Sequence, residues 1–300
     1  MNWITLSLFS ACFLGLYELA KKASLRENAV PPVLFLNVLT GALLWGLMLV
    51  IMRLAPAWIP FERLKTDTLT LHQHGLLFLK SVLAGSSWIF ASFAMKHLPM
   101  SIATPIRATS PLWTISVAVV FMGERPTAVQ WIGVIIILGS FYMFSLVGRK
   151  EGIKFHRDRW VGCMMIATLL GAFSALYDKW LLQRMKFSPS TVQAWFAIYL
   201  LIVMTPLVLH WYIRQRATNR FQWRWSIPMI AVLLLVSDFQ YFSAISCPGA
   251  SISLISPLRR TSVIISFIAA IRIYHEQNWQ DKAIWISGMV IGICVLSASK

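Results

Sequence analysis

The chain has 300 residues, of which 58% are hydrophobic and only 13% are charged, whereas about a quarter of the residues of a soluble domain are charged. This composition excludes a water-soluble domain and predicts a polytopic membrane protein. The formal net charge is +16, but the lysines and arginines lie mostly in short connections between apolar runs. That distribution is typical of membrane topology signals and argues against a nucleic-acid-binding surface.

Ten apolar runs follow one another along the chain. The hydrocarbon core of a bilayer is about 30 Å thick and needs about 20 apolar residues per helix. The runs are long and continuously apolar, which argues against the short alternating strands of a membrane barrel. The expected helices cover residues 3–19, 31–54, 76–95, 101–122, 129–146, 160–182, 191–212, 227–246, 251–271 and 283–298.

One stretch of the sequence occurs twice. Residues 102–110 read IATPIRATS and residues 254–262 read LISPLRRTS, with the proline, one arginine, the threonine and the serine at matching positions. A second match joins residues 16–18 (LYE) to residues 176–178 (LYD). Such self-similarity indicates a tandem duplication. We expect a first repeat over residues 1–148, a basic linker over 149–159 and a second repeat over 160–300.

The number of spans per repeat sets the orientation of the second repeat. Each repeat has five spans, which is an odd number, so the second repeat enters the membrane from the side opposite to the first. The predicted fold is therefore an all-α bundle of ten transmembrane helices built as two inverted five-helix repeats. Inverted repeats are typical of secondary transporters, which bind substrate near the midplane. Lysine and arginine are concentrated in the odd-numbered loops, so the positive-inside rule predicts cytoplasmic odd loops and external termini. We expect a multi-pass protein of a plasma membrane, such as a bacterial inner membrane.

The repeated motif also resembles a known family. The pattern Pro-x-Arg-x-Thr-Ser at residues 105–110, the apolar run after it and the segment GERPTAVQWIG at 123–133 are similar to the second half of an EamA domain of the drug/metabolite transporter superfamily. Residues 257–276, with Gly288 and Gly292, resemble the same pattern again. The resemblance covers the chain as two EamA units and implies a ten-helix metabolite carrier. The second unit departs from the first by three extra residues after Glu276.

Three arginines lie inside apolar runs and need an explanation. Arg107, Arg259 and Arg260 follow a proline closely, and an arginine costs at least about 2.5–3.5 kcal/mol at the membrane centre. The proline leaves backbone carbonyls unpaired, which is tolerated where protein or water covers them. We expect these guanidinium groups to face a polar cavity and to bind a carboxylate or phosphate group of the substrate. The alternative is pairing with internal acids or extension to the interface.

Acidic residues in the spans are the candidate partners of these arginines. Glu18 and Asp178 each follow a tyrosine in the first helix of their repeat, and they are candidates for counter-ions or for binding a coupling proton. Lys21 and Lys22, three and four residues after Glu18, offer a simple helix-end pairing instead. Asp238 has no counterpart in the first repeat, so it is the strongest candidate for proton coupling or for holding an arginine.

Other polar and aromatic side chains in the spans could line the cavity, with interhelical hydrogen bonding as the alternative. These residues are Asn37, Trp88, Gln193, Gln240, Tyr17 and Tyr177. Lys80 and His210 lie towards the ends of their spans and are expected to extend to the interface. Glu124 and Glu276 end the fourth and ninth spans, and they are expected to cap the next helix or to fix a loop.

These observations favour a secondary carrier for a small anionic or zwitterionic solute that works by alternating access. The sequence has no GxxxxGK[ST] loop, so we expect a proton or exchange gradient to drive transport. A lipid-phosphate flippase that uses the same cavity is the alternative. The partners expected are the substrate and the lipid bilayer, without nucleic acid, and the oligomeric state stays open.

Enzymatic chemistry and cofactors are not expected. The six histidines are scattered, with no HxxxH or HExxH spacing. The four cysteines lie in or beside apolar runs without CxxC spacing, so we expect neither a disulfide nor a metal site. They are Cys12, Cys163, Cys247 and Cys294.

Overall fold

The computed structural model describes residues 2–55, 64–98, 106–107, 109–146, 158–262, 264–265 and 279–298. Over these residues the chain is helical and has no strand, which confirms the all-α prediction. The α-helices are α1 (Trp3–Leu25), α2 (Val30–Leu54), α3 (Leu71–His97), α5 (Ser110–Phe121), α6 (Ala128–Leu146), α7 (Arg159–Lys179), α8 (Pro189–Arg214), α9 (Ser226–Ser246), α10 (Ile252–Arg260) and α12 (Trp279–Ala298). A π-helical turn, η3 (Trp180–Arg184), extends α7.

Each of the ten expected spans overlaps one of these helices. Six of them are long and apolar enough to cross a membrane, counting α7 together with η3, and α5, α6 and α12 contain shorter apolar stretches. The fourth and ninth expected spans are described only in part. Residues 106–107 are helical before α5, whereas 101–105 and 108 lie outside the described residues, as do 263 and 266–278 after α10.

Local sequence signals fix where several helices begin. The hydroxyl of Ser188 accepts a hydrogen bond from the Thr191 backbone N–H at 3.3 Å, and Pro189 follows as the first residue of α8. Asp158 accepts from the Trp160 backbone N–H at 2.7 Å at the start of α7. These side chains satisfy backbone donors that the first helical turn leaves unpaired, and proline fits the first turn because its missing donor is not needed there.

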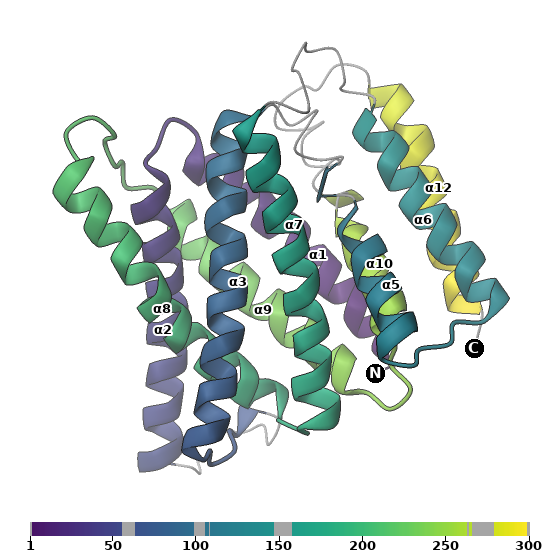
Figure 1. Cartoon of the computed structure of the whole chain (residues 1–300), viewed down its shortest axis with the longest axis horizontal. Helices are drawn as coiled ribbons and strands as arrows, with labels where there is room; N and C mark the ends of the chain where they lie inside the picture. The colour runs from purple at the N-terminus through teal and green to yellow at the C-terminus, as the bar shows by residue number, and fades with distance from the viewer. Residues whose placement is uncertain are drawn as a thin grey trace.

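The helices pair across the two halves of the chain. α1 packs against α9, α3 against α7, α2 against α8 and α6 against α12 (Figure 1). Each pair joins a helix that ends before residue 147 to a helix that begins after residue 158. The two chain ends lie at the same end of the bundle (Figure 1). We call this the terminal end, and the opposite one the loop end.

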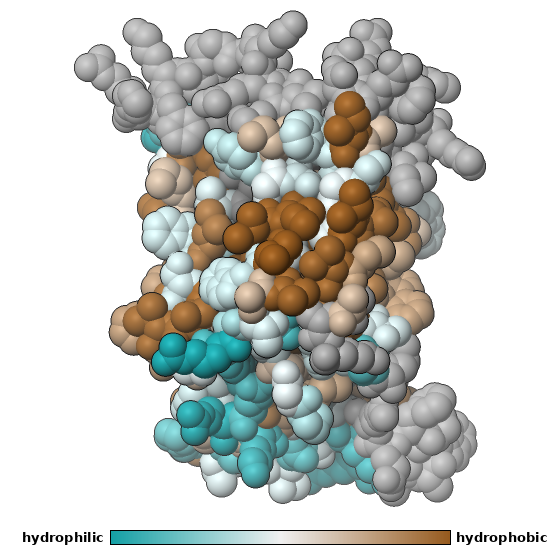
Figure 2. All heavy atoms as spheres, turned by 90° about the vertical axis from the view of Figure 1, so that its right-hand side faces the viewer, coloured by the Kyte–Doolittle hydropathy of each residue, from teal (hydrophilic) through white to brown (hydrophobic). Residues whose placement is uncertain are grey.

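The outer surface is apolar, as a bilayer requires. Figure 2 shows hydrophobic side chains gathered across the middle of the face formed by α6 and α12, with hydrophilic side chains towards the terminal end. Exposed apolar residues on these two helices are Val129, Ile132, Ile135, Ile284, Val290 and Ile291. Exposed apolar area on this scale marks contact with lipid. The chain is an integral, multi-pass membrane protein.

Small residues let the helices around the centre approach closely. A Cβ atom added to Gly15 in α1 would lie 2.6 Å from the carbonyl oxygen of Ser262, which follows α10. A Cβ atom added to Gly292 in α12 would lie 3.1 Å from the carbonyl oxygen of Gly133 in α6. These distances leave no room for a side chain, so glycine sets the helix spacing, as small residues do in membrane bundles.

Two polar contacts tie loops to helix starts at opposite ends of the bundle. At the loop end, Asn28 accepts a hydrogen bond from the Gln222 backbone N–H at 2.9 Å and donates to the Gln222 carbonyl at 2.8 Å. At the other end, Asp67 accepts from the Ser188 backbone N–H at 3.1 Å and from the Thr191 hydroxyl at 3.0 Å. Partial burial raises the pKa of Asp67, but these hydrogen bonds outweigh it and hold the pKa below its usual value.

We predict that Asp67→Ala lowers the free energy of unfolding by about 1 kcal/mol, because the Ser188 backbone N–H and the Thr191 hydroxyl at the start of α8 lose an acceptor. Thermal unfolding in detergent measures the loss, and Thr68→Ala is the control because Thr68 is an exposed neighbour. The pKa of Asp67 is lower in the folded state, so its contribution is complete above about pH 4 and disappears as the pH falls through the folded value. An equal loss in both variants, or a gap that persists in strong acid, would contradict this role.

Candidate functional site

A cavity of about 220 Å³ lies inside the bundle, and charged side chains from both halves of the chain face it. Its cationic lining residues are Lys21, Lys80, Arg107, Arg259 and Arg260, and its acidic ones are Asp178 and Asp238. Aromatic side chains complete the wall, namely Tyr17, Trp88, Phe196, Tyr241 and Phe242. The three arginines that the sequence singled out therefore share one cavity with Asp238.

Arg259 is the most strongly held of these arginines. Its guanidinium forms a salt bridge with Asp238 of α9 and lies 4.1 Å from the centroid of the Tyr241 ring. The same group lies 3.5 Å from the Ser237 hydroxyl. Its Nε is buried and has no hydrogen-bond partner within the described ranges of the chain. A guanidinium with an unused donor can bind a further acceptor, such as an anion oxygen.

Lys80 forms the second ion pair of the cavity. Its Nζ lies 2.6 Å from Asp178 Oδ1 and donates to the Ser174 hydroxyl at 2.8 Å. The two charged side chains are only 5% and 4% exposed, so the expectation that Lys80 extends to the interface is wrong. The reason is that α3 begins at Leu71, which places Lys80 about 13 Å into the helix at 1.5 Å per residue.

Arg107 pairs with Glu18 at the edge of the cavity. The two groups are 3.8 Å apart, and their side chains are 37% and 30% exposed. The Arg107 Nη1 also lies 3.9 Å from the sulfur of Met95. A pair with this exposure contributes little to stability, so a substrate anion can replace Glu18 at small cost.

Two cations of the cavity have no acidic partner among the described residues. They are Lys21, whose Nζ lies 5.6 Å from the Tyr17 ring centroid, and the half-buried Arg260. The other three cations are each paired with one carboxylate. Counted over the residues that the structure describes, the cavity therefore has an excess of two positive charges, and excess charge in a confined, low-dielectric site attracts ions of opposite sign.

The structure does not bring every candidate residue to this cavity. Gln240 is half-buried and lies elsewhere on α9, because two residues turn a helix by about 200° away from Asp238. Tyr177 donates to the Leu76 carbonyl at 3.2 Å and stacks on Trp180. It points away from the cavity that its neighbour Asp178 lines, since one residue is a turn of about 100°.

Asn37 and Gln193 lie against a separate small hollow beside the cavity. This hollow has a volume of about 30 Å³ and shares Trp88 and Asp238 with the cavity. The Gln193 amide donates to the Leu235 carbonyl at 2.5 Å, whereas its Oε1 is buried without a partner among the described residues. Asn37 and Gln193 thus border the cavity wall behind Asp238.

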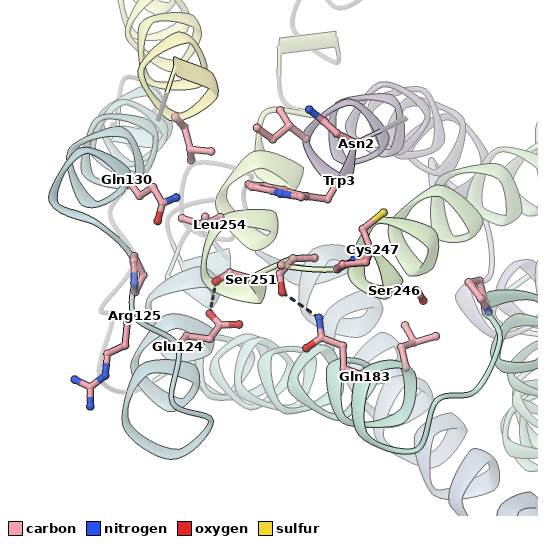
Figure 3. A pocket seen from close by; sticks show the side chains of 18 of the residues that line it. Asn2, Trp3, Glu124, Arg125, Gln130, Gln183, Ser246, Cys247, Ser251 and Leu254 are labelled. Atoms are coloured by element: carbon pink, nitrogen blue, oxygen red, sulfur yellow. Dashed lines mark hydrogen bonds between the residues drawn. The ribbon is translucent and has the colours of Figure 1, made fainter. Parts of the chain in front are cut away.

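A second hollow, of about 1060 Å³, lies at the terminal end, and we call it the terminal vestibule (Figure 3). It is lined by Asn2 and Trp3 of the first helix region, by the loop between α5 and α6, by η3 and by the turn between α9 and α10. Gln183 of η3 donates to the carbonyl groups of Ile245 and Ala250 at 2.8 and 3.0 Å. The vestibule therefore has a polar and hydrogen-bonded wall.

Glu124 is the most densely bonded residue of the vestibule. Its carboxylate lies 2.6 Å from Lys179 Nζ and accepts hydrogen bonds from the Ser251 hydroxyl at 2.5 Å, from the backbone N–H groups of Ile252 and Ser253 at 2.7 and 2.9 Å, and from the Ser253 hydroxyl. Burial raises the pKa of Glu124, but the bonds from Lys179 and the serines outweigh it and hold the pKa below its usual value.

Of the two roles expected for Glu124, capping the following helix or fixing a loop, this arrangement contradicts the first. Thr127 caps the start of α6, because it exchanges hydrogen bonds with Gln130 in a capping box. Gly123, at φ +71°, turns the chain before Glu124, and the carboxylate reaches the start of α10 in the other half of the chain. Glu276 lies outside the described residues.

Residues 1–146 match the EamA-like transporter family. Residues 1–146 therefore belong to this family. The family is part of the drug/metabolite transporter superfamily, so the EamA-like chain is a membrane transporter of that type. The family membership agrees with the resemblance that residues 105–110 and 123–133 carry.

Solved structures extend the fold assignment to the second half of this EamA-like chain. Twenty-nine chains match it. One crystal structure of a protein superposes with a TM-score of 0.70 at 16% sequence identity, over 99% of this chain and 96% of that chain. At that identity the likeness shows the fold alone. No curated protein matches the sequence.

We predict that Asp178→Leu lowers the free energy of unfolding of this EamA-like protein by about 3–5 kcal/mol, because it leaves the Lys80 ammonium buried and unpaired. The double variant Lys80→Met/Asp178→Leu should recover most of that loss. Thermal unfolding in detergent provides the measurement, with Lys96→Met as the control for an exposed lysine. Strictly additive losses in the double variant would show that the two side chains do not depend on each other.

Proposed function

We propose that the chain is a secondary transporter that moves a small anionic or zwitterionic solute by alternating access. The excess of two positive charges in the central cavity is the observation that supports this proposal most directly. The cavity of about 220 Å³ is smaller than the pockets of about 300–1,000 Å³ that hold drug-sized ligands. A metabolite with few heavy atoms fits it better than a large amphipathic molecule.

The proposed architecture is two inverted five-helix repeats, residues 1–148 and 160–300, joined by the linker 149–159. The helix pairs support it, because α1 with α9 and α7 with α3 are equivalent pairs when the repeats are exchanged. The loop contacts support it as well. Asn28 and Ser188 stand at matching positions before the second helix of each repeat, and each is bonded to the loop before the third helix of the other repeat.

The membrane orientation follows from the charge of the two ends. The connection between α8 and α9 carries Arg216, Arg220 and Arg224 and lies at the loop end, away from both termini. Basic segments of this kind stay on the cytoplasmic side. We therefore place the loop end in the cytoplasm and the termini outside, in a plasma membrane such as a bacterial inner membrane.

The positions of Arg259, Arg260 and Asp238 suggest how substrate binding could be coupled to proton uptake. A carboxylate or phosphate group of the substrate would bind the guanidinium groups of Arg260 and Arg259, where bidentate pairing is strong. It would compete with Asp238 for the Arg259 guanidinium. A carboxylate that loses its cationic partner in a low-dielectric site binds a proton more readily, so substrate binding and proton uptake at Asp238 would be coupled.

We predict that Arg259→Ala lowers the rate of substrate uptake about tenfold to a hundredfold, because a charge-assisted contact worth about 1.5–3 kcal/mol is lost. Uptake into liposomes of organic acids, amino acids and phosphorylated metabolites provides the measurement. Arg220→Ala is the matched control because this arginine is exposed in the loop between α8 and α9, and it should transport normally.

The same liposomes test the alternative function. Exposure of a labelled phospholipid on the second leaflet, without uptake of any soluble anion, would favour a lipid-phosphate flippase. Undiminished uptake by Arg259→Ala would remove this arginine from the substrate site.

A further inference from the structure

The two hollows of the molecule are separated by a short stretch of one helix. Leu254 of α10 lines the terminal vestibule, and Ser256 lines the central cavity. Two residues of an α-helix span only about 3 Å along its axis. The side chains of Leu254 and Ser256 point about 200° apart around α10, so the two hollows lie against different sides of this helix and are separated by the space around Ile255.

A buried apolar cluster fills that space, and we call it the plug. Its members at the junction are Leu77, Ala118, Leu181, Leu182, Tyr241, Phe242, Ala250, Ile252 and Ile255. Tyr241 and Phe242 face the cavity, whereas Leu182 and Ala250 face the vestibule. Ile252 and Ile255 are each 1% exposed. A packed apolar layer of this kind excludes water and ions.

Three elements around the plug are held together by one carboxylate. Glu124 comes from the loop after α5, Lys179 ends α7, and residues 251–253 begin α10. The carboxylate also faces the positive end of the α10 dipole. Because α5 belongs to the first half of the chain and α7 and α10 to the second, these bonds hold the two halves together at the terminal end.

We propose that Glu124 is the latch of a gate that closes the central cavity from the terminal vestibule. While its bonds to Lys179 and to the start of α10 are intact, α10 stays against α5 and α7 and the plug remains sealed. When they separate, α10 moves away and the cavity joins the vestibule. Glu124 is a positioning residue in this scheme and does not touch the substrate. The inference rests on the proposed transport function.

The location of the latch makes its opening feasible. Glu124 lines the vestibule, so water can solvate the carboxylate as its bonds break. Ser251 lines the same hollow and can be solvated with it, and Lys179 lies only 2.6 Å from the carboxylate. An ion pair buried in hydrocarbon would pay the full desolvation penalty on separation, whereas a pair at a water-filled hollow does not. The network can therefore alternate between two states.

The test measures the access of a thiol reagent to the cavity from the terminal side. Ser256→Cys is placed in a chain without Cys12, Cys163, Cys247 and Cys294, and a membrane-impermeant thiol reagent is applied to vesicles at the face that carries the termini. In the otherwise unchanged chain we expect slow labelling, because the plug is closed. With Glu124→Gln, labelling should be at least about tenfold faster, since the charge-assisted bonds that favour the closed state are weakened.

Asp67→Asn is the matched control, because it removes another bonded carboxylate at the same end of the bundle, whose bonds go to the start of α8 and not to Lys179 or α10. It should leave the labelling rate unchanged. In a separate chain that keeps native Cys247 as its one cysteine, this residue, which lines the vestibule, should be labelled equally with and without Glu124→Gln. If Glu124→Gln does not fold, Ser253→Ala removes one donor of the same latch and takes its place.

Unchanged labelling of Ser256→Cys in the latch variant would overturn the gate, and so would equal acceleration by Asp67→Asn, which would indicate general loosening. The labelling needs no substrate, so the result is separate from the transport assay. Faster labelling in a protein that transports nothing would support the gate and contradict the proposed function. Transport with unchanged labelling would support the proposed function and contradict the gate.

Discussion

The whole arrangement depends on the cost of placing charged side chains inside a membrane. A charge in the hydrocarbon region must be paired, or must face water, to be tolerated. The bundle uses both solutions, because Arg259 with Asp238 and Lys80 with Asp178 form pairs across helices, whereas Arg260 faces the cavity without a carboxylate among the residues described. The cavity thus retains positive charge, and the helices around it are held in register by the paired charges.

The sequence predicted the features that depend on local chemistry. Long apolar runs predicted the helices, and the energetic cost of Arg107 and Arg259 in such runs predicted that both would be close to polar surroundings. What could not be predicted was which acid meets which base, because pairing depends on how helices rotate and pack. Lys80 shows this most clearly, since its span begins five residues earlier than expected and its partner is more than 90 positions away. The sequence did contain an indication of this pair, because a lysine and an aspartate inside separate apolar runs are each more stable when they pair with an opposite charge.

The long-range bonds of Glu124 are a second feature that the sequence did not predict. A glutamate at the end of a span is commonly a local cap, and nothing in its neighbouring residues indicates a partner on α10. Yet the capping of α6 by Thr127 and Gln130 could be read from the sequence, and it leaves the carboxylate available for other donors. At the terminal end, one acid therefore joins both halves of the chain.

The central claim is that the cavity binds anions through its excess positive charge, and ligand-dependent thermal stability tests it most directly. Purified protein in detergent is titrated with phosphate and with mono- and dicarboxylates, and the unfolding midpoint is followed. We expect a saturable rise in the midpoint with at least one anion, which is lost in Arg260→Ala and kept in Arg220→Ala. No rise with any anion, or an equal rise in both variants, would contradict it.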